Sequence, residues 1–171
     1  MPSSHPPSDA ELEAAARRLG RRLTDRGWQM AAAESCTGGL VGHVITQVPK
    51  SSDHFLGGIV SYSNAAKEGL LGVPADLLAR VGAVSAEVAE AMTSGALERF
   101  PAAHLALAVT GIAGPDGGSD EKPVGLTYVA AALRDGDAVV ERHLWAHDRH
   151  GNKRASALAA LELASRLTGE G

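Results

Sequence analysis

The chain has 171 residues, of which 44% are hydrophobic and 21% charged, and this balance predicts one globular domain with a buried core. A net charge of −4 gives no broad basic field, so nucleic-acid binding has no electrostatic support. No apolar run approaches the roughly 20 residues that span a bilayer, so we expect no membrane partner. The single cysteine excludes an internal disulfide and fits a cytoplasmic location.

The beginning of the chain is polar and proline-rich, and we expect a flexible tail over residues 1–10 and a single domain over residues 11–168. Ser8 and Glu11 form a capping-box pattern before a run with one apolar helical face. This pattern predicts a first helix, which Gly27 ends.

Short apolar runs alternate with amphipathic segments along the rest of the chain. Asn64 is predicted to cap a short helix through Leu71, and Ser85 is predicted to cap a longer one. A further helix is expected before Pro49, and the last one near the end of the chain. The runs expected as strands are 28–33, 54–62, 104–109, 124–133 and 138–145.

The order of these elements predicts the fold class. Strands alternate with helices in the first part of the chain, whereas an Asp-Gly pair at 135–136 separates the last two strands and indicates a hairpin. We therefore predict an α/β fold with three layers, in which helices cover both faces of a mixed sheet. Open sheets of this kind bind ligands at their strand-to-helix turns.

The first such turn is the segment 34–39, Glu-Ser-Cys-Thr-Gly-Gly. Unpaired N–H groups at a helix N-terminus attract negative charge, so a nucleophile there has donors for an oxyanion. Ser35 is one candidate nucleophile, and Cys36 is another because a helix N-terminus lowers the pKa of a thiol. The alternatives are a helix-capping role for Ser35 or Thr37 and a buried structural role for Cys36. The residues alone leave this choice open.

The second turn, at 61–67, contains a candidate base. Lys67 falls in the first turn of the expected helix, where the helix dipole and burial both favour the neutral amine. A lysine of lowered pKa can serve a serine as general base, and Tyr62 is placed to orient the proton. The alternative is a solvated lysine beside a strand tyrosine.

The third turn, at 110–119, is rich in glycine and follows a strand. Its free N–H groups are typical of an anion-binding concavity, although the spacing matches neither a Walker loop nor a dinucleotide fingerprint. Arg149 and Arg154 flank the start of the last helix and are candidates for contacting a phosphate. His143, His147 and His150 lack the ligand spacing of a metal site, so we expect no metal.

Taken together, several ordered motifs resemble one family. They are Ala33-Glu34-Ser35-Cys36-Thr37-Gly38-Gly39, the segment 57–64 with Lys67, Gly72-Val73-Pro74, the segment 82–85 and the segment 108–115. The chain is similar over residues 11–167 to the CinA C-terminal domain family, whose stand-alone members include nicotinamide-nucleotide amidases. Longer relatives carry an additional N-terminal domain, and activities of that domain are not carried over.

The resemblance implies hydrolysis of nicotinamide mononucleotide to nicotinate mononucleotide and ammonia, with Ser35 as nucleophile and Tyr62 and Lys67 in support. It implies no cofactor and no metal, and it implies a homo-oligomer. A non-catalytic nucleotide-binding module and a serine amidohydrolase acting on another small amide are the alternatives. Asp116 departs from the family pattern, in which we expect a third glycine. The residues expected to contact the nucleotide substrate are Glu34, Thr37, Gly38, Gly39, Asn64, Thr110, Gly111, Ala113, Gly114 and Arg149.

Overall fold

The computed structural model describes residues 5–169, so part of the expected tail, residues 1–4, lies outside the described residues. The helices are α1 (Asp9–Arg26), α2 (Leu40–Gln47), α3 (Asn64–Leu71), α4 (Ala75–Val81), α5 (Ala86–Arg99) and α6 (Arg149–Leu167), with a short 3-10 helix η1 (Ser51–Asp53). The strands are β1 (Met30–Glu34), β2 (Phe55–Val60), β3 (Leu105–Gly111), β4 (Leu126–Leu133) and β5 (Ala138–Leu144). The first helix begins at Asp9, two residues before the expected domain boundary.

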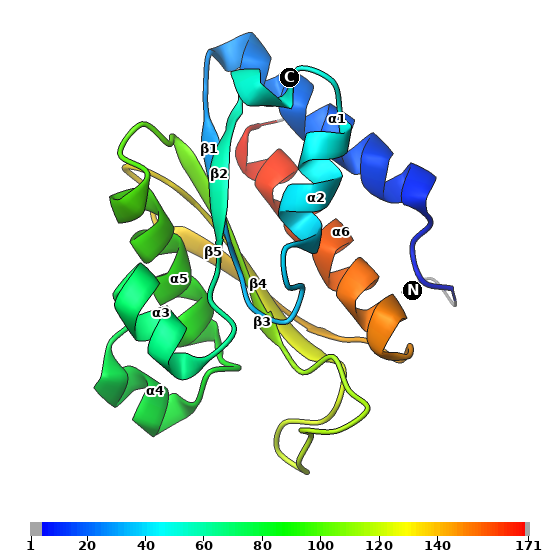
Figure 1. Ribbon diagram of the computed structural model, residues 1–171, viewed down its shortest axis with the longest axis vertical. Coiled ribbons are helices and arrows are strands. Elements are labelled where there is room, and N and C mark those ends of the chain that lie inside the picture. The colour runs from blue at the N-terminus through cyan, green and yellow to red at the C-terminus, as the bar shows by residue number, and fades with distance from the viewer. Residues whose placement is uncertain (1–4, 170–171) are drawn as a thin grey trace.

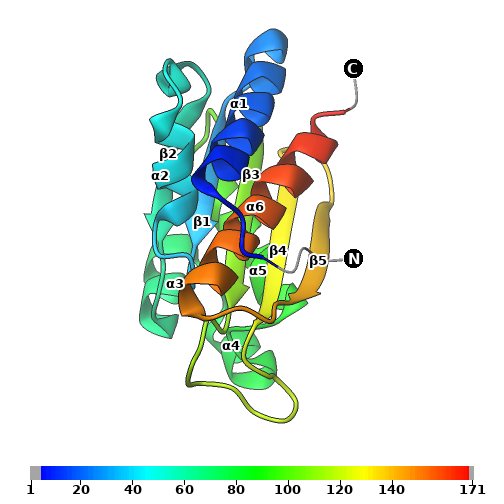
Figure 2. The ribbon, with the colours of Figure 1, turned by 90° about the vertical axis from the view of Figure 1, so that its right-hand side faces the viewer.

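The five strands form one mixed sheet in the order β2-β1-β3-β4-β5. Strand β1 pairs in parallel with β2 and with β3, whereas β4 and β5 are antiparallel to their neighbours. Helices α1, α2 and α6 cover one face and α3, α4 and α5 cover the other (Figures 1 and 2). The predicted three-layer α/β/α fold with a late antiparallel hairpin is therefore confirmed.

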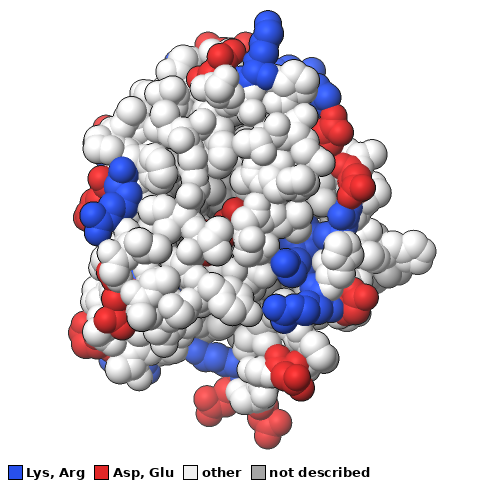
Figure 3. Space-filling view, in the orientation of Figure 1, with Lys and Arg blue, Asp and Glu red and all other residues white. Residues whose placement is uncertain are grey.

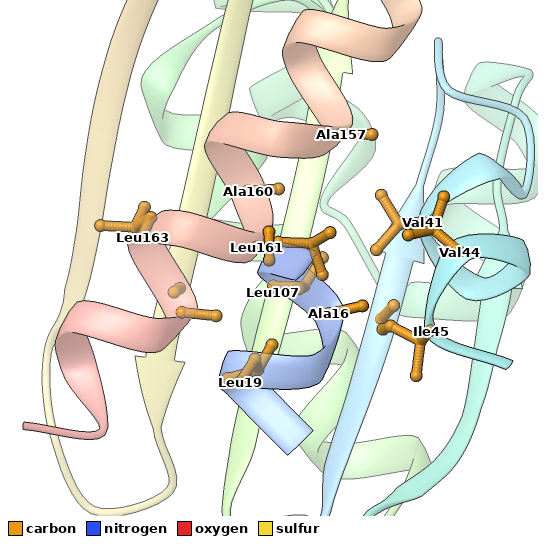
Figure 4. Packing of buried hydrophobic residues seen from close by; sticks show 14 of the residues in the cluster. Ala16, Leu19, Val41, Val44, Ile45, Leu107, Ala157, Ala160, Leu161 and Leu163 are labelled. Carbon is orange, nitrogen blue, oxygen red and sulfur yellow. The ribbon is translucent and has the colours of Figure 1, made fainter. Parts of the chain in front are cut away.

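Side chains of alternate residues in β1 enter two separate cores. Met30 and Ala32 join the core beneath α1, α2 and α6, and Ala31 and Ala33 join the core beneath α3, α4 and α5. All four are fully buried, as the period of two along a strand requires when both faces are covered. Figure 4 shows α6 packing against α1 and α2 through alanine, valine, leucine and isoleucine side chains. The small side chains let the helices lie close to the sheet.

The helix N-termini follow the capping signals of the sequence, except that one cap lies one residue earlier than predicted. Ser8 and Glu11 make the predicted capping box, and Ser85 accepts a hydrogen bond from the amide of Val88 as an N-cap. The prediction that Asn64 caps α3 is wrong, because the hydroxyl of Ser63 accepts the hydrogen bond of the Ala66 amide at 3.0 Å. Serine and asparagine are almost equally good N-caps, so adjacent residues compete for the position.

Helix α3, which bears Lys67, is held against α5 by a close backbone approach. A Cβ atom on Gly95 of α5 would lie 2.0 Å from the carbonyl oxygen of Leu71, so only glycine fits there. Among the described residues, no helix is long and apolar enough to cross a membrane.

Candidate active site

The three predicted loops meet at one edge of the sheet. Ser35 follows β1, Ser61 and Tyr62 follow β2, and Thr110 lies at the end of β3. Since these three strands are parallel and adjacent, their carboxyl ends meet, and β1 places Ser35 between the other two loops. A pocket of about 240 Å³ opens here and is lined by residues of all three loops and of α6.

Backbone hydrogen bonds that extend the sheet fix the position of Ser35. Its amide donates to the carbonyl of Val109 at 2.9 Å, and the amide of Ser61 donates to the carbonyl of Glu34 at 2.8 Å. Gly38 and Gly39 then turn the chain into α2 with φ values of 62° and 100°, which side-chain-bearing residues rarely adopt. Ser35 is 6% exposed and borders the pocket.

Lys67, on α3, contacts Ser35. Its Nζ lies 3.0 Å from Ser35 Oγ, and it donates to the carbonyl oxygens of Ser61 at 2.8 Å and of Tyr62 at 3.2 Å. The lysine is 1% exposed, and no acidic side chain bonds to its Nζ in the described structure. The alternative of a solvated lysine, which the sequence left open, is therefore wrong for Lys67.

The environment of Lys67 favours its neutral form. Burial lowers the pKa of the amine from its ordinary value of 10.5 because the charged form loses its hydration. A neutral amine has two N–H donors and one lone pair, and the two carbonyls are acceptors that take both donors. In the structure Nζ donates to Ser35 Oγ. When the amine is neutral, its lone pair is left to accept the O–H of Ser35, which is the arrangement that a general base requires.

Cys36 also borders the pocket, but unlike Ser35 it is part of the apolar core. It is buried among the apolar side chains beneath α1, α2 and α6, and burial raises the pKa of its thiol to about 12. A thiol with this pKa stays protonated near neutral pH and is a weak nucleophile. Of the two candidates in this loop, Ser35 is the one that contacts Lys67 Nζ in the described structure.

Tyr62 contributes its backbone rather than its ring to the lysine. Its carbonyl accepts from Lys67, whereas its side chain is 63% exposed and its hydroxyl lies 3.4 Å from Nη2 of Arg149. The predicted use of the phenol to orient the proton has no supporting contact in the described structure. Tyr62 and Arg149, which contact each other, both border the pocket.

The carboxylate of Glu34, predicted to bind substrate, is used inside the protein. It is 3% exposed and accepts from the amides of Val41 at 2.8 Å and Gly42 at 3.1 Å. These amides belong to the first turn of α2, where a negative charge satisfies unpaired donors and the helix dipole. Glu34 therefore fixes the loop that carries Ser35 and does not border the pocket.

The remaining backbone amides of this loop differ in whether they already have a hydrogen-bond acceptor. The amide of Gly38 donates to the carbonyl of Ser35 at 3.0 Å, so this predicted oxyanion donor is already engaged. In the described structure the amides of Cys36, Thr37 and Gly39 have no acceptor. The side chain of Thr37 is 1% exposed and its buried hydroxyl has no partner among the described residues.

Residues of the glycine-rich loop are fastened at several points. The hydroxyl of Thr110 donates to the carbonyl of Ala83 at 2.8 Å. A Cβ on Gly111 would lie 2.6 Å from Thr127 Oγ1, so this glycine serves the packing of β4. The carbonyls of Ala113 and Gly114 accept hydrogen bonds from side chains of α6, and both residues border the pocket.

Helix α6 supplies contacts that the sequence predicts only in part. Arg149 Nη1 donates to the carbonyl of Gly114 at 2.7 Å, and Asn152 Nδ2 donates to the carbonyl of Ala113 at 3.0 Å. Asn152 and Ser61 were missed, because an asparagine inside a helix and a serine that acts through its carbonyl carry no local signature. Asn64, expected to contact substrate, is exposed on α3 and does not border the pocket.

Basic side chains gather over the start of α6 (Figure 3). Arg149 and Lys153 line a hollow that continues from the pocket past Ala113 and Pro115. Arg154, the other predicted phosphate contact, instead pairs with Asp9 at 2.7 Å and donates to the carbonyl of Pro7 at 2.6 Å. Among the described residues, no group of three or more His, Cys, Asp or Glu is arranged to hold a metal ion.

Comparison with known proteins places the chain in a family. Residues 12–168 match the family described as "CinA C-terminal domain". The chain belongs to this family. A "CinA-like protein" of Geobacter sulfurreducens is 51% identical over 154 residues, which cover 90% of this chain and 36% of that protein. The chain thus spans about a third of the length of this curated CinA relative.

Solved CinA structures share the fold over nearly their whole length. The "competence/damage inducible protein CihA" of Agrobacterium tumefaciens is 41% identical, with a TM-score of 0.87 over 94% of this chain and 96% of that one. The "competence damage-inducible protein A (ComA)" of Klebsiella pneumoniae is 32% identical, with a TM-score of 0.88 over 94% of this chain and 99% of that one. Membership of the CinA family, expected from the motifs, is confirmed.

Proposed function

We propose that this CinA-family chain is a serine amidohydrolase that converts nicotinamide mononucleotide into nicotinate mononucleotide and ammonia. The observation that carries the proposal is the contact between Lys67 Nζ and Ser35 Oγ at 3.0 Å, made by a buried lysine whose two other contacts are carbonyl oxygens. Ser-Lys pairs are a known variant of the catalytic triad. The mononucleotide as substrate rests on the family resemblance.

In the proposed reaction Lys67 takes the proton of Ser35 as the oxygen attacks the carboxamide carbon. The resulting tetrahedral oxyanion accepts hydrogen bonds from the unengaged amides of Cys36 and Thr37. The ammonium of Lys67 returns the proton to the departing nitrogen, and ammonia leaves an ester on Ser35. Water, deprotonated by Lys67, then attacks this ester and releases the carboxylate product.

The rest of the pocket suits the ribose-phosphate part of such a substrate. Arg149 and Lys153 supply positive charge beside the glycine-rich loop. Guanidinium groups bind phosphate oxygens through charge-assisted hydrogen bonds. Asp116 also borders the pocket, and its negative charge favours a phosphate position nearer to α6 than to the tip of the loop.

The decisive experiment measures ammonia and nicotinate mononucleotide formed from nicotinamide mononucleotide by purified wild-type protein and by Ser35→Ala. We expect stoichiometric release by the wild type and none above background by the variant. If the wild type binds the nucleotide but leaves the amide intact, the chain is a nucleotide-binding module instead. Activity confined to other small amides in a parallel panel would retain the chemistry and reject the substrate.

A further inference from the structure

Asn152 lies behind the pocket, where it connects two loops to α6. Its side chain is 1% exposed, its Oδ1 accepts from the amide of His147 at 3.1 Å, and its Nδ2 donates to the carbonyl of Ala113 at 3.0 Å. Both ends of the amide group are therefore used, and they fix its orientation. The nucleotide proposal assigns no role to this residue.

The hydrogen bond to Ala113 determines where the next amide points. Among the described residues only the Gly114–Pro115 peptide bond is cis, so the bond between Ala113 and Gly114 is trans. In a trans peptide the carbonyl and the following N–H point in opposite directions. With the Ala113 carbonyl turned toward Asn152, the N–H of Gly114 points away from α6.

The amide of Gly114 is also free. It has no acceptor in the described structure, and Gly114 itself borders the pocket that contains Ser35. Its φ of 86° and the 2.4 Å between a hypothetical Cβ and Val124 Cγ1 exclude a side chain that would cover this N–H. Arg149 holds the Gly114 carbonyl at 2.7 Å, so the loop is fastened on both sides of the amide.

We infer that Asn152 is a positioning residue that holds the Gly114 N–H toward the pocket as a donor to an oxygen of the bound nucleotide. This inference deepens the proposed function and rests on it for the identity of the ligand. A buried network also holds the backbone of Asn152. Ser156 Oγ donates to the backbone carbonyl of Asn152 at 2.7 Å, and Trp145 Nε1 donates to Ser156 Oγ at 3.0 Å.

The test uses Asn152→Asp, which keeps the shape and the acceptor for His147 but loses the donor to Ala113. The backbone amide of Gly114 is followed by NMR in ¹⁵N-glycine-labelled full chain while nicotinamide mononucleotide is added, in a Ser35→Ala background that prevents turnover. We expect this resonance to shift in the parent and the dissociation constant to rise by about tenfold to hundredfold in the variant. In otherwise wild-type protein, KM should rise with little change in kcat.

Ser156→Ala is the matched control, because it weakens the same buried network without touching the amide group of Asn152. It should lower the melting temperature and leave the dissociation constant within about twofold. Should Asn152→Asp not fold, Asn152→Ala removes the same donor without introducing a charge. An unchanged dissociation constant in a folded variant would overturn the inference, as would a Gly114 amide that stays unmoved when the parent is saturated with nucleotide.

The two proposals fail in different ways. If the wild type hydrolyses nothing but the Gly114 resonance shifts in an Asn152-dependent manner, the positioning role stands and the amidase does not. If the wild type hydrolyses the nucleotide and Asn152→Asp has unchanged KM, the amidase stands and the positioning role does not. Addition of inorganic phosphate alone identifies the oxygen: a shift assigns the donor to the phosphate, and no shift assigns it to the rest of the nucleotide.

Discussion

Lys67 Nζ lies 3.0 Å from Ser35 Oγ although the two residues are 32 positions apart in the chain and lie on different strand-to-helix turns. The contact exists because β1 and β2 are parallel neighbours, which brings the loops that follow them to the same edge of the sheet.

Ser35→Ala should reduce kcat for the nucleotide by about a thousandfold or more, because no other hydroxyl among the described residues bonds to Lys67. Cys36→Ala is the matched control at the next residue. It removes a buried sulfur from the apolar core and should cost about 1 kcal/mol of unfolding free energy while kcat stays within a few-fold. The opposite pattern, activity kept without Ser35 and lost without Cys36, would identify the thiol as the nucleophile.

Thiol-labelling kinetics test the environment of Cys36 separately from activity. Burial raises its pKa to about 12, so almost no thiolate exists near neutral pH, and the side chain is also shielded from reagents. Folded protein should react with iodoacetamide at least about a hundredfold more slowly than protein unfolded in denaturant. Equal rates in the two states at pH 8 would show an exposed, activated thiol.

The pH profile of kcat/KM should report Lys67 as the base. Activity requires the neutral amine, so kcat/KM should rise with pH and level off at the pKa of Lys67 in the free enzyme. Burial lowers this pKa, so the plateau should begin below 10.5. Lys67→Arg, which stays cationic, should be inactive across the range, whereas a rising limb that persists in this variant would exclude Lys67 as its source.

Lys67 should also make the stability of the fold depend on pH. With its pKa lower in the folded than in the unfolded state, the unfolded chain binds a proton first as pH falls below 10.5. Stability is therefore lost from 10.5 down to the folded pKa and is constant below it. Denaturant unfolding gives the unfolding free energies of the wild type and of Lys67→Met. As pH falls from 10.5 to the folded pKa, the unfolding free energy of the wild type should fall relative to that of the variant. A difference that is the same at pH 7 and pH 10.5 would contradict the lowered pKa.

Arg149→Gln should affect substrate affinity more than the chemical step. The variant loses the charge-assisted bond to the Gly114 carbonyl and the contact with the hydroxyl of Tyr62. We expect KM for the nucleotide to rise about tenfold or more, with kcat changed far less. Arg154→Gln is the control on the same helix, since Arg154 binds Asp9 and Pro7 instead, and its KM should match that of the wild type.

The sequence by itself determined the order and type of the strands and of the helices other than η1 and α4, because these depend on local signals. The capping box at Ser8 and the Asp-Gly hairpin involve only near neighbours, and both are confirmed. The cap of α3 was assigned one residue too late, to Asn64 instead of Ser63, because two adjacent residues have similar capping preferences.

Only the tertiary structure decided the role of each site residue, because that role depends on contacts with segments that are distant in the chain. Ser35 and Cys36 both border the pocket, and the choice between them follows from Lys67, whose Nζ contacts the hydroxyl of Ser35. The carboxylate of Glu34 is committed to α2, and Asn152 reaches Ala113 from 39 positions away. The loops that carry the chemistry were visible in the sequence. The burial and hydrogen-bond partners that assign each side chain were not, since they arise only when distant segments pack together.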